Sequence, residues 1–216
     1  MIAGYAGLLM LCGCQPAGPV AYKITVVPAD RTLREQVLYS ESVWARDKIA
    51  LIDIEGILIN AARRQLLGEG EHPVSLLVEK LEAAAADPAV KAVVLRINSP
   101  GGSVTASDIM YQQVRRFRQQ TGRPVIAALM DLAASGGYYV ACACDEIVAQ
   151  PTCVTGSIGV IMMTFNIEGT LRKIGMQAEV IKSGPRKDAG SIFRKLTPTE
   201  REMFQQVVDE LYERFV

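Results

Sequence analysis

A regular alternation of short apolar runs with longer amphipathic segments constrains the fold of this chain more than any other feature of its sequence. The apolar runs at residues 49–54, 90–97 and 125–130 are typical of buried strands. Between them, residues 73–86 and 103–120 carry apolar side chains at helical spacing. Parallel strands need long crossover connections of this kind. The sequence therefore predicts an α/β fold with a mainly parallel sheet and crossover helices.

The alternation continues toward the C-terminus. Further elements are expected at residues 136–144 (helix), 146–149 (strand), 158–164 (strand), 168–174 (helix) and 178–182 (strand). A last helix is expected from Thr197, where Thr-Pro-Thr-Glu combines a capping box with proline at the first helical position. Because no C-terminal cap follows before Val216, the pattern indicates a C-terminal helical part that is truncated.

The N-terminal segment differs from the rest of the chain. Residues 1–14 are apolar and rich in small side chains, as in the core of a signal peptide, and are too short to span a bilayer as a helix. The ending Leu-Cys-Gly-Cys resembles a lipobox that would make Cys14 an acylated anchor, although no basic residue precedes Lys23. We expect a membrane-associated chain on the extracytoplasmic face, divided into a leader (1–21), an approach segment with an isolated strand near 24–27 (22–47) and a main domain (48–216).

Composition excludes several classes of function. Lysine plus arginine and aspartate plus glutamate number 23 each, without long runs of one sign, so the chain lacks the basic surface of a nucleic-acid-binding protein. Five cysteines, with Cys142 and Cys144 only two positions apart, suit neither a disulfide framework nor a zinc site. We expect no nucleic-acid partner, no metal and no cofactor.

Two loops that follow predicted strands have unusual sequences, and such loops are where function gathers in open α/β folds. Residues 98–102 end in paired glycines before a helix, and Ser135 lies between small residues at the start of the next helix. A serine at a helix N-terminus can act as a nucleophile. The N–H groups of Gly136 and of Gly101 or Gly102 can form an oxyanion hole. Together the two loops predict an acyl-transfer site.

A serine nucleophile needs a general base, and the only histidine does not suit this role. His72 lies in a polar loop before a helix, where a solvated or capping residue is expected. A lysine can act instead if burial or a nearby cation populates its neutral form. Lys182 and Lys187 flank a glycine-containing loop after a predicted strand, and chemistry alone does not decide between them.

Four segments resemble, in this order, the signature segments of the signal peptide peptidase A (SppA) family: Asn98 to Gly102, Ala133 to Tyr139, Thr155 to Val160 and Ile181 to Asp188. The family consists of Ser-Lys peptidases with the Clp-protease/crotonase fold, and the similarity runs from about Lys48 to the end of the chain. Four motifs spread over roughly ninety residues are far more specific than one glycine loop.

The resemblance implies a role for each motif. Ser135 takes the place of the nucleophile, and Lys187 takes the place of the base. The backbone N–H groups of Gly102 and Gly136 correspond to the oxyanion hole, and the substrate cleft includes Gly101, Ser157 and Ile158. No metal or cofactor is implied.

The resemblance also implies partners. Family members degrade apolar signal-peptide remnants at the membrane and form rings in which neighbouring copies complete each active site. They usually continue for several dozen residues past the point that corresponds to Val216.

Two alternatives stay open. A crotonase-like acyl-CoA hydratase or isomerase shares the fold, but such enzymes rely on glutamates where this chain has Ser135. An inactive membrane scaffold of the same fold is the other alternative, although every catalytic position is filled.

Overall fold

The computed structural model describes residues 20–26, 33–40, 42, 44–62 and 72–216. The expected lipobox and Cys14 lie outside the described residues, so the lipid anchor and the domain division stay predictions. Within the described ranges, no helix is both long and apolar enough to cross a bilayer.

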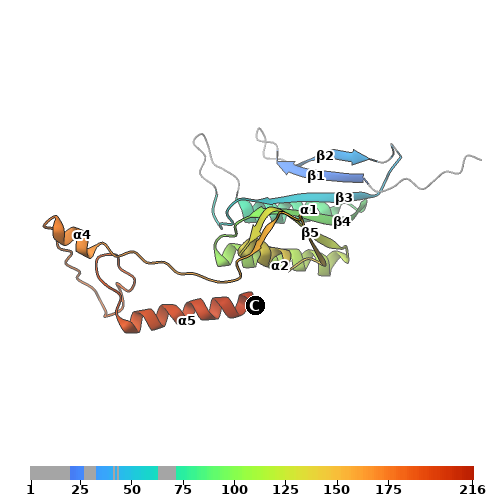
Figure 1. Cartoon of the computed structure of the whole chain (residues 1–216). Coiled ribbons are helices and arrows are strands. Elements are labelled where there is room, and N and C mark those ends of the chain that lie inside the picture. Colours follow the sequence, from blue (N-terminus) through green and yellow to red (C-terminus); the bar gives the residue numbers. More distant parts are fainter. Residues whose placement is uncertain (1–19, 27–32, 41, 43, 63–71) are drawn as a thin grey trace, which may run out of the picture.

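A mainly parallel sheet forms the body of the protein (Figure 1). Its strands follow the order β2-β1-β3-β4-β5-β6, and β7 pairs with the C-terminal end of β5. Among the described strands, β1 and β2 pair antiparallel and all other neighbours pair parallel. The strands are β1 Val20–Val26, β2 Leu33–Ser40, β3 Lys48–Glu55, β4 Val90–Ser99, β5 Val125–Ala134, β6 Glu146–Ala149 and β7 Val154–Gly156. The predicted α/β fold is thereby confirmed.

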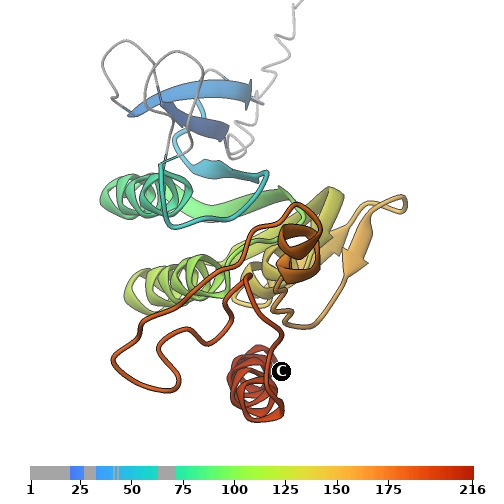
Figure 2. The ribbon, with the colours of Figure 1, turned by 90° about the vertical axis from the view of Figure 1, so that its left-hand side faces the viewer.

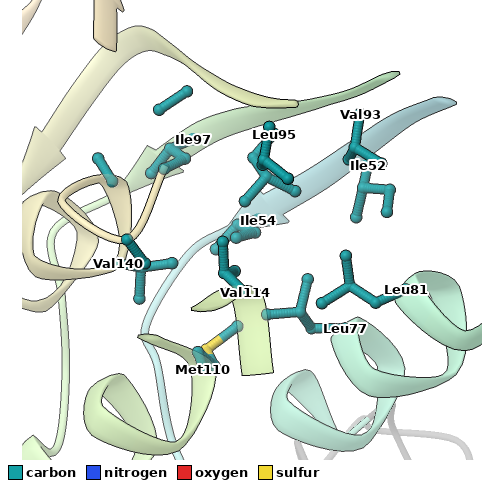
Figure 3. Close-up of a cluster of buried hydrophobic side chains, with 14 of the residues drawn as sticks. Ile52, Ile54, Leu77, Leu81, Val93, Leu95, Ile97, Met110, Val114 and Val140 are labelled. Atoms are coloured by element: carbon teal, nitrogen blue, oxygen red, sulfur yellow. The ribbon is translucent and has the colours of Figure 1, made fainter. Parts of the chain in front are cut away.

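Helices α1 (Pro73–Ala86) and α2 (Val104–Thr121) lie against one face of this sheet (Figures 1 and 2). Alternate residues of β3 and β4 are buried on that face, as the pleat of a strand requires. Burying each large aliphatic side chain contributes about 1.5–3 kcal/mol. Figure 3 shows the resulting core, in which the strand residues Ile52, Ile54, Val93, Leu95 and Ile97 face the helix residues Leu77, Leu81, Met110 and Val114.

Helix α1 begins as the sequence indicates. His72 is its N-cap, and the His72 Nδ1 atom accepts a hydrogen bond of 3.3 Å from the Ser75 N–H. This confirms that His72 is a capping residue, as the sequence predicted.

The C-terminal third of the chain leaves the sheet. We call residues 157–197 the arm; its one described helix is α4 (Glu168–Lys173), which lies apart from the sheet (Figure 1). Helix α5 (Pro198–Phe215) then returns toward the body of the protein (Figures 1 and 2). It begins with the predicted capping box, in which Thr197 and Glu200 exchange both hydrogen bonds.

Three predictions of strands need correction. The stretches 158–164 and 178–182 form no strand in the described structure, and their apolar side chains are exposed, with Ile161 85% and Ile181 98% accessible. A strand needs a neighbouring backbone for its hydrogen bonds, and within the described part of the chain no strand pairs with either stretch. The strand predicted near residues 24–27 is not isolated, because β1 pairs with both β2 and β3.

Candidate active site

Ser135 occupies the turn between β5 and α3 (Gly136–Ala141) in a strained conformation. Its φ is 50° and its ψ is −123°, a region that glycine adopts readily and other residues adopt at a cost. Two backbone bonds hold it there: the Ser135 N–H donates to the Gly156 carbonyl at 2.8 Å, and the Ser135 carbonyl accepts from the Tyr139 N–H at 2.9 Å. The Ser135 hydroxyl does not cap α3, so it is available for chemistry.

The glycines of the 98–102 loop let two backbones meet beside Ser135. Gly101 has a φ of 90°, and a Cβ atom on it would lie 2.5 Å from the Gly136 nitrogen and 2.9 Å from the Ser135 Cβ. A Cβ atom on Gly102 would collide with the backbone of Leu58. The first N–H groups of a helix lack partners within the helix, which leaves the Gly136 N–H free to face a ligand. The sequence-predicted Gly101, Gly102, Ser135 and Gly136 are therefore brought together.

Two side-chain hydroxyls fix these loops by hydrogen bonds to backbone carbonyls. The Ser99 hydroxyl, fully buried, donates to the Gly56 carbonyl at 2.7 Å and accepts from the Gly101 N–H at 3.0 Å. The Thr155 hydroxyl donates to the Ala133 carbonyl at 2.7 Å and so ties β7 to the end of β5. Sequence reasoning gave Ser99 no role of its own and placed Thr155 only in the stretch 155–160 that shapes the substrate cleft. The signal for both is a hydroxyl near the end of a strand.

A pocket opens beside Ser135. Gly102 and Gly136 line it together with Ser135. Its apolar wall consists of Val104, Val160, Ile161, Leu211 and Phe215, and Ser107, Asp108, Tyr139, Gly159 and Arg214 complete the lining. The predicted cleft residues Ser157 and Ile158 directly precede the stretch 159–161 that lines it. A charged side chain against this apolar wall would lose solvation, whereas Asp108 and Arg214 supply charge elsewhere in the lining.

An ion pair and stacked rings attach the end of α5 to this pocket. Arg214 donates to Asp108 at 3.1 and 3.2 Å, and the Tyr139 hydroxyl donates to Asp108 at 3.0 Å. Burial raises the pKa of Asp108, but these hydrogen bonds outweigh it and the net shift is downward. Burial and the Asp108 carboxylate raise the pKa of Tyr139 to about 12, and its ring stacks on Phe215 at 5.0 Å. No sequence signal connects these residues, because α2 and α5 are far apart along the chain.

The two candidate lysines lie on the arm, and neither lines the described Ser135 pocket. Lys182 donates to the Asp188 carboxylate at 2.6 Å and to the Pro185 carbonyl at 3.2 Å. Lys187 is exposed, and its ammonium group has no ion-pair partner among the described residues. The structure thus separates Ser135 from the predicted base within one chain.

The length of helix α5 indicates how far the lysine loop lies from the Ser135 pocket. Its first turn is linked through Glu200 and Arg194 to Asp188, the neighbour of Lys187, and its last turn lines the Ser135 pocket. Its 18 residues span about 27 Å at 1.5 Å per residue. The lysine loop and the pocket of the same chain therefore lie near opposite ends of one helix.

The fold and the site together define an α/β protein with a serine acyl-transfer site. Residues 117–216 match the model of peptidase family S49. The chain is 34% identical over 170 residues to Protease 4 of Haemophilus influenzae (79% of this chain, 27% of that protein). It is 37% identical over 172 residues to the chloroplastic serine protease SPPA of Arabidopsis thaliana (79% and 25%). A Synechocystis relative is 35% identical over 171 residues, again 79% of this chain and 57% of that protein.

Residues 117–216 thus match peptidase family S49, and most of the chain is similar to SppA-type serine proteases, so the resemblance to the SppA family is confirmed. It spans between a quarter and about three fifths of the length of these relatives. The shared part includes Ser135, Lys182 and Lys187, since the family match extends from residue 117 to residue 216.

Proposed function

We propose that this protein is a serine endopeptidase that cleaves apolar, membrane-associated peptides such as remnants of signal peptides. The observation that carries the proposal is the geometry at Ser135, whose strained turn is packed against Gly101 and placed between Gly102 and Gly136. A serine on a sharp turn with free N–H groups on both sides has the parts of an acyl-transfer site. The apolar wall of the pocket supports the choice of substrate.

The reaction would run through an acyl-enzyme. The Ser135 oxygen attacks the peptide carbonyl carbon while a neutral lysine takes the hydroxyl proton, and the N–H groups of Gly102 and Gly136 bind the resulting oxyanion. When the peptide C–N bond breaks, the lysine returns the proton to the leaving amine. Water, deprotonated by the same lysine, then hydrolyses the ester and frees Ser135.

Lys187 is the better candidate for the base. The Lys182 ammonium group is held by the Asp188 carboxylate at 2.6 Å and by the Pro185 carbonyl at 3.2 Å, so it is engaged within its own loop. Lys187 has no such partner among the described residues and protrudes from the same loop. This distinction was not available from the chemistry of the sequence.

We further propose that Lys187 serves the Ser135 of a neighbouring copy in a ring. The separation of about 27 Å along α5 supports this arrangement, because a lysine side chain cannot bridge it within one chain. The apolar and exposed side chains of the arm also need a partner surface, which a second copy would supply.

Mixing two inactive variants tests both parts of the proposal. Ser135→Ala and Lys187→Met should each be inactive on apolar peptides and should react poorly with a serine-directed phosphonate. If the ring is reassembled from equal amounts of both, about a quarter of the sites combine an intact serine with an intact lysine from the next copy. Recovered activity supports sites shared between copies, and none would place both residues in one chain.

The nucleophile itself is tested by mass spectrometry of the labelled protein. We expect one phosphonate per chain, on Ser135, and none in Ser135→Ala. Binding of an acyl thioester without phosphonate labelling would favour the hydratase alternative instead.

The location of the protein is also a proposal. The apolar leader supports attachment to the extracytoplasmic face of a membrane, with Cys14 as the acylated residue. Membrane fractionation of Cys14→Ser tests this: release into the soluble fraction supports acylation, and unchanged membrane binding would contradict it.

A further inference from the structure

Four charged residues of the arm and of α5 form one continuous set of ion pairs, which we call the clamp: Lys182, Asp188, Arg194 and Glu200. Arg194 grips Asp188 with two donors, Nε to Oδ2 at 2.8 Å and Nη2 to Oδ1 at 2.9 Å. The same guanidinium binds both carboxylate oxygens of Glu200, with Nη1 to Oε2 at 2.8 Å. The planar fork of arginine is thus used on two carboxylates at once.

The clamp closes the loop that carries Lys187. Lys182 at its start binds the carboxylate of Asp188 at its end, and Lys182 also donates to the Pro185 carbonyl in between. Lys187 immediately precedes Asp188, so its backbone is fixed on one side by the ion pairs. The Lys187 N–H donates to the Gly184 carbonyl at 3.2 Å and makes the loop tighter still.

The clamp also joins this loop to the first turn of α5. Glu200, besides binding Arg194, accepts the Thr197 N–H at 2.9 Å as part of the capping box. The last turn of α5 lines the pocket of Ser135. Helix α5 therefore connects the Lys187 loop with the Ser135 pocket. The clamp attaches the loop to the N-terminal end of this helix.

Burial sets the clamp apart from an ordinary surface ion pair. The side chains of Glu200 and Asp188 are 6% and 12% exposed, although most of the arm is exposed. Glu168 and Arg172 on α4 form an ion pair of the usual exposed kind, with the arginine 73% accessible. Lys182 and Arg194 keep 32% and 28% of their side chains exposed, so the clamp is a partly buried network around two shielded carboxylates. Carboxylates removed from water cost desolvation unless they are well paired, and the four linked residues provide that pairing in the arrangement seen here.

We propose that the clamp holds the Lys187 amine at a defined position relative to α5, and that Arg194 is its central positioning residue. The inference rests on the proposed role of Lys187 as the base. In a ring of identical copies, fixing Lys187 on α5 of one chain fixes it relative to the Ser135 of the next. Arg194 touches neither the substrate nor the reacting atoms; it acts through the lysine loop.

The test compares Arg194→Met with Arg172→Met, a matched substitution in the exposed ion pair of the same arm. Displacement of a catalytic group by about 1 Å can cost on the order of 100-fold in rate. For Arg194→Met we expect kcat to fall by roughly 10- to 100-fold with KM changed less than about threefold. Arg194→Lys, which keeps the charge but lacks the fork, should recover part of the loss. Arg172→Met should behave like the parent.

Hydrogen exchange reports on the clamp independently of activity. The amides of residues 183–191 should exchange faster in Arg194→Met and at the parental rate in Arg172→Met. Unchanged exchange, a kcat close to that of the parent, or a rise in KM alone would each overturn the clamp proposal. A failure of the proposed function would give another result. In that case Ser135→Ala or Lys187→Met would keep its peptidase activity, independently of the effect of Arg194→Met.

Discussion

At the scale of single residues, the unusual backbone of Ser135 is the strongest indication of function. A φ of 50° at a residue with a side chain costs of order 1–3 kcal/mol and persists only where the surroundings impose it. Here the Gly156 carbonyl and the Tyr139 N–H impose it from both sides. In this conformation Ser135 lines the pocket, and its hydroxyl does not cap the helix that it precedes.

The strain makes a prediction about stability. Ser135→Ala and Ser135→Gly should both be inactive, because each lacks the nucleophilic oxygen. Ser135→Gly should be more stable than Ser135→Ala by roughly 1 kcal/mol, since glycine adopts this conformation freely, less its larger loss of entropy on folding. Chemical denaturation of the two variants measures the difference. An alanine variant that is the more stable of the two would mean that the turn is not strained.

Gly101 in the 98–102 loop and Gly122 at the C-terminal end of α2 separate the effect of limited space from the effect of backbone strain. Gly101 and Gly122 both have positive φ, but a Cβ atom on Gly101 meets the Gly136 nitrogen at 2.5 Å, whereas one on Gly122 meets nothing within 4 Å. Gly122→Ala should lose about 1 kcal/mol of stability and keep its activity. Gly101→Ala should lose activity, because the two loops must move apart. Peptide cleavage and unfolding of both variants test this, and an active Gly101→Ala would disprove the role of close contact.

At the scale of elements, α5 is more than a terminal helix. Its capping box starts it at Thr197, its first turn carries the clamp residue Glu200, and its last turn reaches the pocket through Arg214 and Phe215. The helix therefore relates the lysine loop to the serine pocket, although neither Lys187 nor Ser135 belongs to it.

The acid sensitivity of this element follows from Glu200. Hydrogen bonds from Arg194 and from the Thr197 backbone lower the pKa of Glu200 from 4.5 to about 2. A depressed carboxyl pKa adds stability that is fully present above the ordinary pKa and is lost as the pH falls through the folded pKa. Between pH 4.5 and 2, the Tm of the parent should therefore fall more steeply than that of Arg194→Met. Arg172→Met serves as the control and should keep the parental slope; equal slopes in all three would contradict the coupling.

At the scale of the whole molecule, the arm exposes apolar side chains that the described part of a single chain does not cover. Its residues Ile161, Phe165 and Ile181 are 85%, 68% and 98% exposed. Single exposed apolar residues are common, but a segment that gathers many of them indicates an interaction surface. The separation of Lys187 from Ser135 indicates the same.

Assembly should therefore depend on the arm. Ile181→Asp should shift the protein to smaller oligomers in size-exclusion chromatography with light scattering, and its activity should fall in parallel, because a buried aspartate without a partner is costly. Val37→Asp on β2, which is similarly exposed at 63%, is the matched control and should assemble normally. Normal assembly and activity of Ile181→Asp would show that the arm is not the contact surface.

The sequence by itself determined the α/β fold, the main strands and helices, the His72 and Thr197 caps, and the grouping of Ser135 with Gly101, Gly102 and Gly136. These features depend on local periodicity, on capping chemistry, and on the rule that parallel strands end at one edge of a sheet. Only the tertiary structure decided the fate of residues 158–164 and 178–182, the partners of β1, and the attachment of α5 to α2 by Arg214 and Asp108. It also distinguished Lys182, bound to Asp188, from the exposed Lys187. Each of these depends on which distant segment lies alongside, and hydrophobic periodicity carries no information about that.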